Sequence, residues 1–212
     1  FFKFINNSKI IAWYSQNCII EHPKIFKIPI GLDYHTLYFC GNDHPWGKSC
    51  TPIEQEIVLN NIRDFALPFW ERFKICYSNF HFSLNNGLRI GCSRQSIVDL
   101  IPKDLIFYEP VFISREDSWL CQTKYAFVIS PHGNGLDCHR TWEAFYLGAV
   151  PVVLKSEYTG DESWPVLVID SWERFVRLEP KALRDLYKKY AKTREQSIAF
   201  SINLLEKLKN QI

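Results

Sequence analysis

The sequence predicts an α/β fold in which a parallel β-sheet is flanked by helices. From Lys74 onward, short apolar runs alternate with amphipathic stretches, which is the pattern of a parallel sheet. Residues 126–154 contain a complete strand–loop–helix–strand unit. The chain has 212 residues, of which 47% are hydrophobic and 16% aromatic, so it can bury a sizeable core as one large domain or two small ones.

The amino-terminal part is poorer in regular structure. Strands are expected over residues 9–15 and 25–30, and Gly31 to His35 follow the second strand, where a site loop would lie. A loop rich in Gly, Pro and Asn precedes Pro52. A helix is expected to begin there, because proline is favoured in the first helical turn, and to run to about Phe73. Residues 1–73 therefore hold two predicted strands and one predicted helix.

The remainder of the chain alternates between the two element types. We expect strands at the start of 74–84 and over 105–108, 126–130, 150–154 and 166–169, and helices over 94–101 and 115–125. Ser114 and Ser171 precede predicted helices and are candidate N-caps. Residues 180–212 form a long, charged amphipathic helical region. These boundaries predict three parts, at residues 1–73, 74–179 and 180–212.

The unit at residues 126–154 is where a ligand is expected. Pro131 and two glycines, Gly133 and Gly135, interrupt the chain after a buried strand. Asp137 is a candidate N-cap for the next helix, and Gly148 is a candidate helix stop. Ligands of open α/β sheets bind at the carboxyl ends of the strands, near the positive end of the following helix. Glycines there would let the backbone approach an anion closely.

Two charged residues lie on one face of that predicted helix. Arg140 and Glu143 are three positions apart. Arg140 suits a phosphate because its guanidinium offers two donors in a fixed fork, and Glu143 suits the hydroxyls of a ribose. The alternative is an ordinary helix cap beside a surface Arg–Glu pair.

Residues 130–156, SPHGNGLDCHRTWEAFYLGAVPVVLKS, resemble the donor-site stretch of exostosin-like glycosyltransferases, including short bacterial and large-DNA-virus forms. They resemble the carboxyl-half motif of α1,3-fucosyltransferases more loosely. A weaker likeness runs through WYSQNC, PIGLDYHTL and YSNFHF. Both families belong to the two-Rossmann-domain (GT-B) class of sugar-nucleotide transferases. The resemblance implies a Rossmann-like nucleotide-sugar-binding domain over 74–179 and a reduced or truncated acceptor-side part over 1–73.

The resemblance also implies a set of donor-binding residues. In fucosyltransferases a Ser-Asn strand is followed by an arginine that contacts the donor phosphate. Arg94 is the closer match to that arginine here, and Arg89 is the alternate. His81 also resembles a family position. The alternative is that the arginines are solvated surface residues and that the histidine has a structural role. The expected donor-binding residues are Gly133, Asn134, Gly135, Asp137, His139, Arg140, Thr141, Glu143, Arg94, Arg89 and His81.

The implied reaction is inverting transfer of a sugar from a UDP- or GDP-sugar to a hydroxyl of a glycan or glycoprotein. It needs a base for the acceptor hydroxyl and positive charge for the leaving diphosphate. No Asp-x-Asp motif occurs in the sequence, so a helix terminus and basic side chains are expected to supply that charge without a metal or other cofactor.

Asp33 is the first candidate for the base and His35 the second, because both follow a predicted strand on the acceptor side of the expected cleft. The alternative for Asp33 is an Asx-turn. Trp13, Tyr14 and Trp46 could stack on acceptor sugars, although aromatic residues are more often core. Arg115 opens a predicted helix and is expected to lie on the surface.

Composition and motifs limit which other classes of protein the chain could belong to. The net charge of +2 gives no argument for nucleic acid, and no apolar run is long enough to span a membrane. Seven cysteines without a C-x-x-C motif predict reduced thiols and a cytoplasmic location, in the host cytoplasm if the chain is viral. A non-catalytic glycan- or nucleotide-binding module is the alternative. A Rossmann oxidoreductase is disfavoured because no G-x-G-x-x-G follows an early strand. Oligomeric state, donor sugar and acceptor are not predicted.

Overall fold

The centre of the protein is a parallel five-stranded sheet. The computed structural model describes residues 1–41, 44–80, 94–159, 166–177 and 180–189. The strands are β3 (Phe73–Ser78), β4 (Ile106–Tyr108), β5 (Tyr125–Ile129), β6 (Val150–Leu154) and β7 (Leu167–Ile169), in the order β4-β3-β5-β6-β7. The parallel sheet predicted from the alternating pattern is confirmed, and the fold is consistent with a Rossmann-like one. The chain winds from β3 outward to β4 and returns to β5, so the strand order reverses between β3 and β5.

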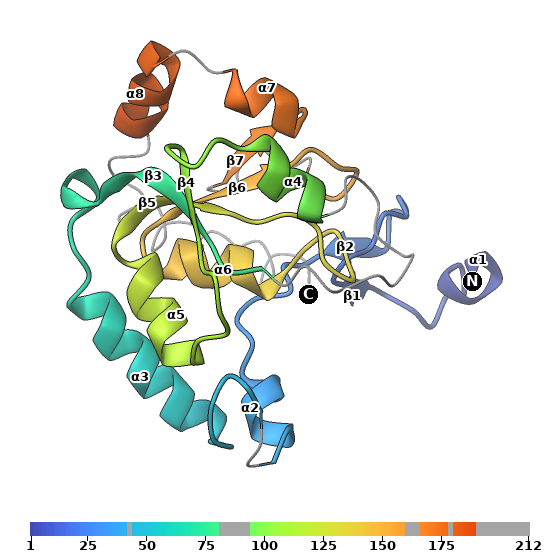
Figure 1. Cartoon of the computed structure of the whole chain (residues 1–212). Coiled ribbons are helices and arrows are strands. Elements are labelled where there is room, and N and C mark those ends of the chain that lie inside the picture. Colours follow the sequence, from blue (N-terminus) through green and yellow to red (C-terminus); the bar gives the residue numbers. More distant parts are fainter. Residues whose placement is uncertain (42–43, 81–93, 160–165, 178–179, 190–212) are drawn as a thin grey trace.

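Helices cover both faces of this sheet (Figure 1). α4 (Arg94–Leu100), α7 (Trp172–Val176) and α8 (Pro180–Lys189) lie on one face, and α5 (Arg115–Gln122) and α6 (His139–Tyr146) lie on the other. The first face packs the main core, which includes Ile97, Phe127 and Trp172. The second is smaller and is formed around Tyr77 and Val128. The result is a three-layer α/β/α arrangement, the expected way for a parallel sheet to bury both faces.

The α6–β6 connection shows why the chain turns where it does. α6 ends at Tyr146 with Leu147 as its C-cap, and Gly148 follows with a φ of +80°, a left-handed conformation that favours glycine. A Cβ at Gly148 would also lie 2.9 Å from Nη2 of Arg72. The predicted helix stop at Gly148 is confirmed.

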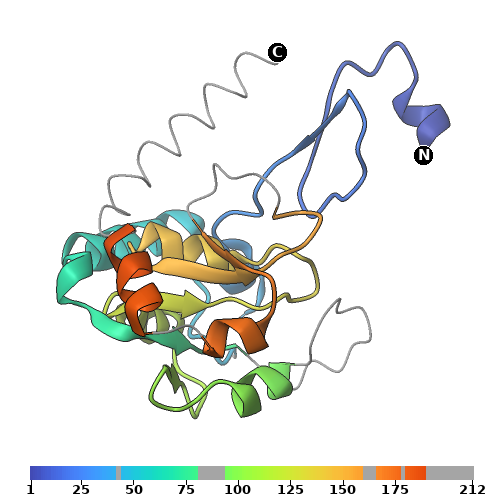
Figure 2. The same ribbon diagram turned by 90° about the horizontal axis from the view of Figure 1, so that it is seen from above.

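The amino-terminal part carries a second, smaller sheet. β1 (Trp13–Ser15) and β2 (Ile25–Lys27) pair in parallel, apart from the five-stranded sheet. Figure 2 shows this part extending away from the main body and ending at α1 (Phe2–Ile5). α2 (His35–Phe39) follows β2, and a 3₁₀ helix, η1 (Phe69–Glu71), precedes β3. α1 and α2 were not expected, because helical periodicity is not visible over so few residues, and η1 lies within the stretch where the helix from Pro52 was expected to continue.

α3 (Pro52–Asp64) begins as predicted but ends early. Thr51 and Glu54 form a reciprocal capping box in front of Pro52. The helix stops at Asp64 rather than near Phe73, because Pro68 disfavours helical backbone before it. α3 packs its Leu59 and Ile62 side chains against Trp119 of α5. It therefore joins the amino-terminal part to the same layer that α5 and α6 form.

The carboxyl-terminal helical region is described in part. α8 accounts for Pro180–Lys189 of the predicted helical region, and residues 190–212 lie outside the described residues. Across the described segments, no helix is both long enough and apolar enough to cross a membrane.

Candidate functional site

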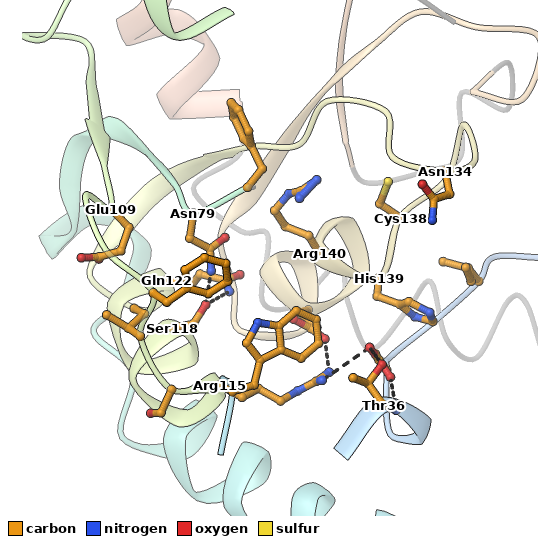
Figure 3. A pocket seen from close by; sticks show the side chains of 18 of the residues that line it. Thr36, Asn79, Glu109, Arg115, Ser118, Gln122, Asn134, Cys138, His139 and Arg140 are labelled. Atoms are coloured by element: carbon orange, nitrogen blue, oxygen red, sulfur yellow. Dashed lines mark hydrogen bonds and ion pairs between the residues drawn. The ribbon is translucent and has the colours of Figure 1, made fainter. Parts of the chain in front are cut away.

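A cavity of about 850 Å³ opens at the carboxyl ends of β3, β4 and β5 (Figure 3). Its walls include residues 79–80 after β3, 109–114 after β4, and 134–135 and 137–140 after β5. The strand order reverses between β3 and β5, and open α/β sheets bind their ligands at this point. The amino-terminal part closes the other side with Asn17, Ile30, Asp33, His35, Thr36 and Trp46.

Most of the site residues expected from the sequence line this one cavity. They are Asp33, His35, Arg94, Asn134, Gly135, Asp137, His139, Arg140 and Glu143. Thr141 does not, because its buried hydroxyl hydrogen-bonds to that of Ser130 at 2.8 Å. Gly133 is not among the residues that line the cavity, and His81 and Arg89 lie outside the described residues.

The two glycines of the loop after β5 make room for neighbouring side chains. A Cβ on Gly135 would lie 2.5 Å from Oδ1 of Asn17, and one on Gly133 would lie 2.9 Å from Sγ of Cys138. Asn17 in turn accepts a hydrogen bond from the backbone N–H of Asp137 at 2.7 Å. Gly135 thus lets the loop pack against Asn17 of the amino-terminal part, a requirement that is invisible in the local sequence, and Gly133 makes room for Cys138 within the loop.

Asp137 is not the N-cap of α6. The N-cap is Cys138, which makes no side-chain capping bond. The Asp137 carboxylate instead accepts the backbone N–H of Ile30 at 2.7 Å and the indole N–H of Trp142 at 2.8 and 2.9 Å. Burial raises the pKa of the Asp137 carboxyl, and these hydrogen bonds oppose that rise. Asp137 thus ties the segment after β2 to α6, and it is too engaged to serve as a free ligand.

Asp137→Asn should destabilise the protein by about 1–3 kcal/mol, because one uncharged amide oxygen replaces the two charged oxygens that accept from Ile30 and Trp142, and the amide nitrogen cannot accept a hydrogen bond. Urea denaturation would measure the change. Asp170→Asn is a matched control, since the Asp170 side chain is 57% exposed and pairs with Arg174 on the surface. It should shift stability by less than about 1 kcal/mol. Equal midpoints for both variants would contradict the tie.

Two arginines anchor one wall of the cavity. The guanidinium carbons of Arg94 and Arg140 each lie 5.7 Å from the centre of the Phe80 ring. Arg94 is buried and its Nε donates to the His132 carbonyl at 3.3 Å, while Nη2 of half-buried Arg140 donates to the Pro131 carbonyl at 3.2 Å. The amino terminus of α6 lies beside them, so positive charge and helix dipole converge on the same wall.

Arg115 is not on the surface as expected; it is 5% exposed. Its guanidinium lies 4.9 Å from the ring of Trp119 and 5.2 Å from that of Trp46. Its Nη2 donates to Glu143, and its Nη1 lies 3.5 Å from Oδ2 of Asp33 (Figure 3). Glu143 therefore pairs across the cavity with α5, which contradicts a surface pair with Arg140. Local sequence could not reveal this pair, because it depends on how two helices pack.

Asp33 lies at the centre of a polar cluster at the amino-terminal side. It accepts the N–H of Thr36 at 2.9 Å and the hydroxyl of Thr36 at 2.7 Å, and Nδ1 of His35 lies 3.0 Å from its Oδ1. His139, from α6, donates Nδ1–H to the carbonyl of Gly31 at 2.8 Å. The two imidazole rings are 5.3 Å apart. The cluster thus joins the start of α2 to the start of α6.

Burial acts to raise the pKa of Asp33. The hydrogen bonds from Thr36 and the charges of Arg115 and His139 together outweigh that effect, so the pKa falls below its usual 3.8. Because the folded-state pKa is the lower one, this carboxylate stabilises the fold above pH 3.8, and the contribution is lost as pH falls through the folded value. Asp33 is therefore ionised at neutral pH and is a weak proton acceptor.

The sequence analysis missed a polar group at the β4 side of the cavity. Glu109 directly follows β4, and its Oε2 accepts the hydroxyl of Tyr77 at 3.3 Å. Asn79, which follows β3, and Gln122 both hydrogen-bond to the hydroxyl of Ser118. The available signal was position: Asn79 and Glu109 each come directly after a strand, and those strand ends meet at one edge of the sheet.

The sequence matches no protein-family model, and it matches no curated protein. What the site does must therefore be argued from its residues.

Proposed function

We propose that this protein is an inverting glycosyltransferase that uses a nucleotide-diphosphate sugar, with a GT-B-type division into a donor domain and a reduced acceptor side. One observation carries the proposal: residues expected from the sequence to bind a sugar nucleotide, although far apart in the chain, line a single cavity at the switch point of the sheet. The cavity is within the range of volumes that small-molecule sites occupy.

The donor diphosphate is assigned to the wall formed by Arg94, Arg140 and the first turn of α6. Two guanidinium groups and backbone N–H groups would stabilise the charge that develops on the leaving group. Glu143, held by Arg115, would accept a hydrogen bond from a ribose hydroxyl through its other oxygen. Glu143→Gln would then lower donor affinity while Arg94 and Arg140 stay in place.

The base is assigned to His35, with Asp33 as the residue that positions it. The oxygens of Asp33 already contact Thr36, His35 and Arg115, and its lowered pKa disfavours proton uptake. The His35 side chain is 62% exposed and lines the cavity. With Nδ1–H directed at Asp33, Nε2 of His35 is the imidazole atom that would accept a proton from an acceptor hydroxyl. The contacts thus favour the second of the two sequence-based candidates.

A donor screen tests the proposal. UDP, GDP and their common sugar conjugates would be titrated against the protein in a calorimeter, and sugar release from any conjugate that binds would then be followed over time. Binding with slow hydrolysis supports a transferase. Because the amino-terminal part pairs only two strands among its described residues, a binding module is the second candidate, and it would show binding without hydrolysis. The absence of binding for every nucleotide would contradict both.

Turnover should persist in excess EDTA, because arginine side chains and the α6 terminus are assigned the role that a metal has in Asp-x-Asp enzymes. The measurement is the initial rate after dialysis against chelator, compared with the rate after adding Mg²⁺ or Mn²⁺. A complete loss of activity that either ion restores would show that the leaving group depends on a metal after all.

A further inference from the structure

Three side chains that can ligate metals converge at one end of the cavity. Asp33, His35 and His139 each offer one ligand atom, and these atoms all lie within 4.8 Å of one another. We propose that this triad binds a divalent transition-metal ion such as Zn²⁺, and that the bound ion inhibits the protein by occupying the base. The binding rests on the triad alone, whereas the inhibition rests on the proposed function.

The donor set fits such an ion. Two imidazoles and one carboxylate are typical of zinc sites that keep an open position. Tetrahedral coordination with bonds of about 2.0–2.2 Å places ligand atoms about 3.3–3.6 Å apart, so the triad must contract slightly. His35 can make that adjustment, because its side chain is 62% exposed and the ring contacts that would change, with Asp33 and His139, are to the other two ligands. The fourth position would open into the cavity.

The ligands are also held from behind. The Gly31 carbonyl accepts Nδ1–H of His139 at 2.8 Å, which leaves Nε2 of that ring as the ligand atom. Thr36 fixes Asp33 through its N–H and its hydroxyl. Carbonyl and hydroxyl partners of this kind orient metal ligands and set the histidine tautomer. Asp33 and His139 would therefore need little reorganisation to bind the ion.

The local charge accepts a cation. Arg115 lies 3.5 Å from Asp33 and would repel an ion, but it also pairs with Glu143. Asp33, Glu143 and Arg115 together carry one net negative charge. Protons compete with metals for imidazole, so binding should weaken as the pH is lowered.

Calorimetry with Zn²⁺ on the intact chain tests the site. We expect one ion per chain, bound at least about tenfold more weakly by His139→Asn. In that variant the asparagine N–H can still reach the Gly31 carbonyl, while the Nε2 ligand atom is gone. His22→Asn is the control, because His22 hydrogen-bonds to Asn6 and to the N–H of Lys24 and not to the triad. It should bind Zn²⁺ as the wild type does.

The absorption spectrum of the Co²⁺ complex separates the triad from the seven cysteines of the chain. Nitrogen and oxygen ligands give only weak visible bands, and thiolate ligands add an intense near-ultraviolet band. A thiolate band, equal Zn²⁺ affinity in wild type and His139→Asn, or no binding at all would each overturn the proposal. Nucleotide binding measured on the metal-free protein stands apart from these results, so failure of the proposed function would be recognised separately.

Discussion

Replacing Arg140 with alanine should weaken binding of the nucleotide diphosphate by about 1.5–3 kcal/mol, or roughly 10- to 150-fold. The physical reason is loss of a charge-assisted hydrogen bond at a wall where the helix dipole also favours an anion. Arg140 is half-buried above Phe80 and is anchored to the Pro131 carbonyl, so its guanidinium is already held in position before a ligand arrives. Calorimetry with the nucleotide found in the donor screen would measure the loss.

Controls distinguish a phosphate contact from a general loss of structure. Arg174→Ala removes an arginine whose side chain is 74% exposed and forms an ion pair with Asp170. Arg174 does not line the cavity, so donor affinity should not change. Arg140→Lys keeps the charge but not the fork, and we expect an intermediate affinity. The free nucleoside, which lacks phosphate, should bind the wild type and Arg140→Ala equally. Equal diphosphate affinity in both proteins would remove Arg140 from the site.

The parallel sheet was predictable because its signal is local. Each strand is a short apolar run, and two of the intervening helices have a cap or stop residue that acts within a few positions, Ser114 before α5 and Gly148 after α6. The edge of the sheet at which a ligand would bind follows from this alternation. The helices α1 and α2 were not predicted, because four or five residues are too few to display helical periodicity.

The candidate site was predictable in part for the same reason. Arg94 and Arg140 open helices that follow strands, so their positions at the cavity follow from the order of elements. The pairs Arg115–Glu143 and Asp137–Ile30 were not predictable, because each joins segments that meet only after the helices have packed. Long-range packing makes Asp137 a structural tie. The role of Asp33 changes through a local contact instead, because Thr36, three residues further on, donates two hydrogen bonds to its carboxylate.

His35 is the proposed proton acceptor for the acceptor hydroxyl. His35→Asn should lower turnover by about 10²–10⁴-fold, the scale of a general base, while donor affinity stays within about twofold. Asparagine keeps an N–H that can reach Asp33, but it has no atom at the position of Nε2. The variant therefore removes the proposed proton acceptor and preserves the contact behind it.

Asp33→Asn tests the role of the positioning residue. It removes the charge that holds the imidazole and that pairs with Arg115, so turnover should fall, but a pH dependence of the rate should remain because His35 is still present. In His35→Asn that pH dependence should disappear. If Asp33→Asn abolished the pH dependence and His35→Asn retained it, Asp33 would be the base despite its lowered pKa. If both variants turned over at the wild-type rate, the base would have to be sought elsewhere on the cavity wall, beginning with Glu109.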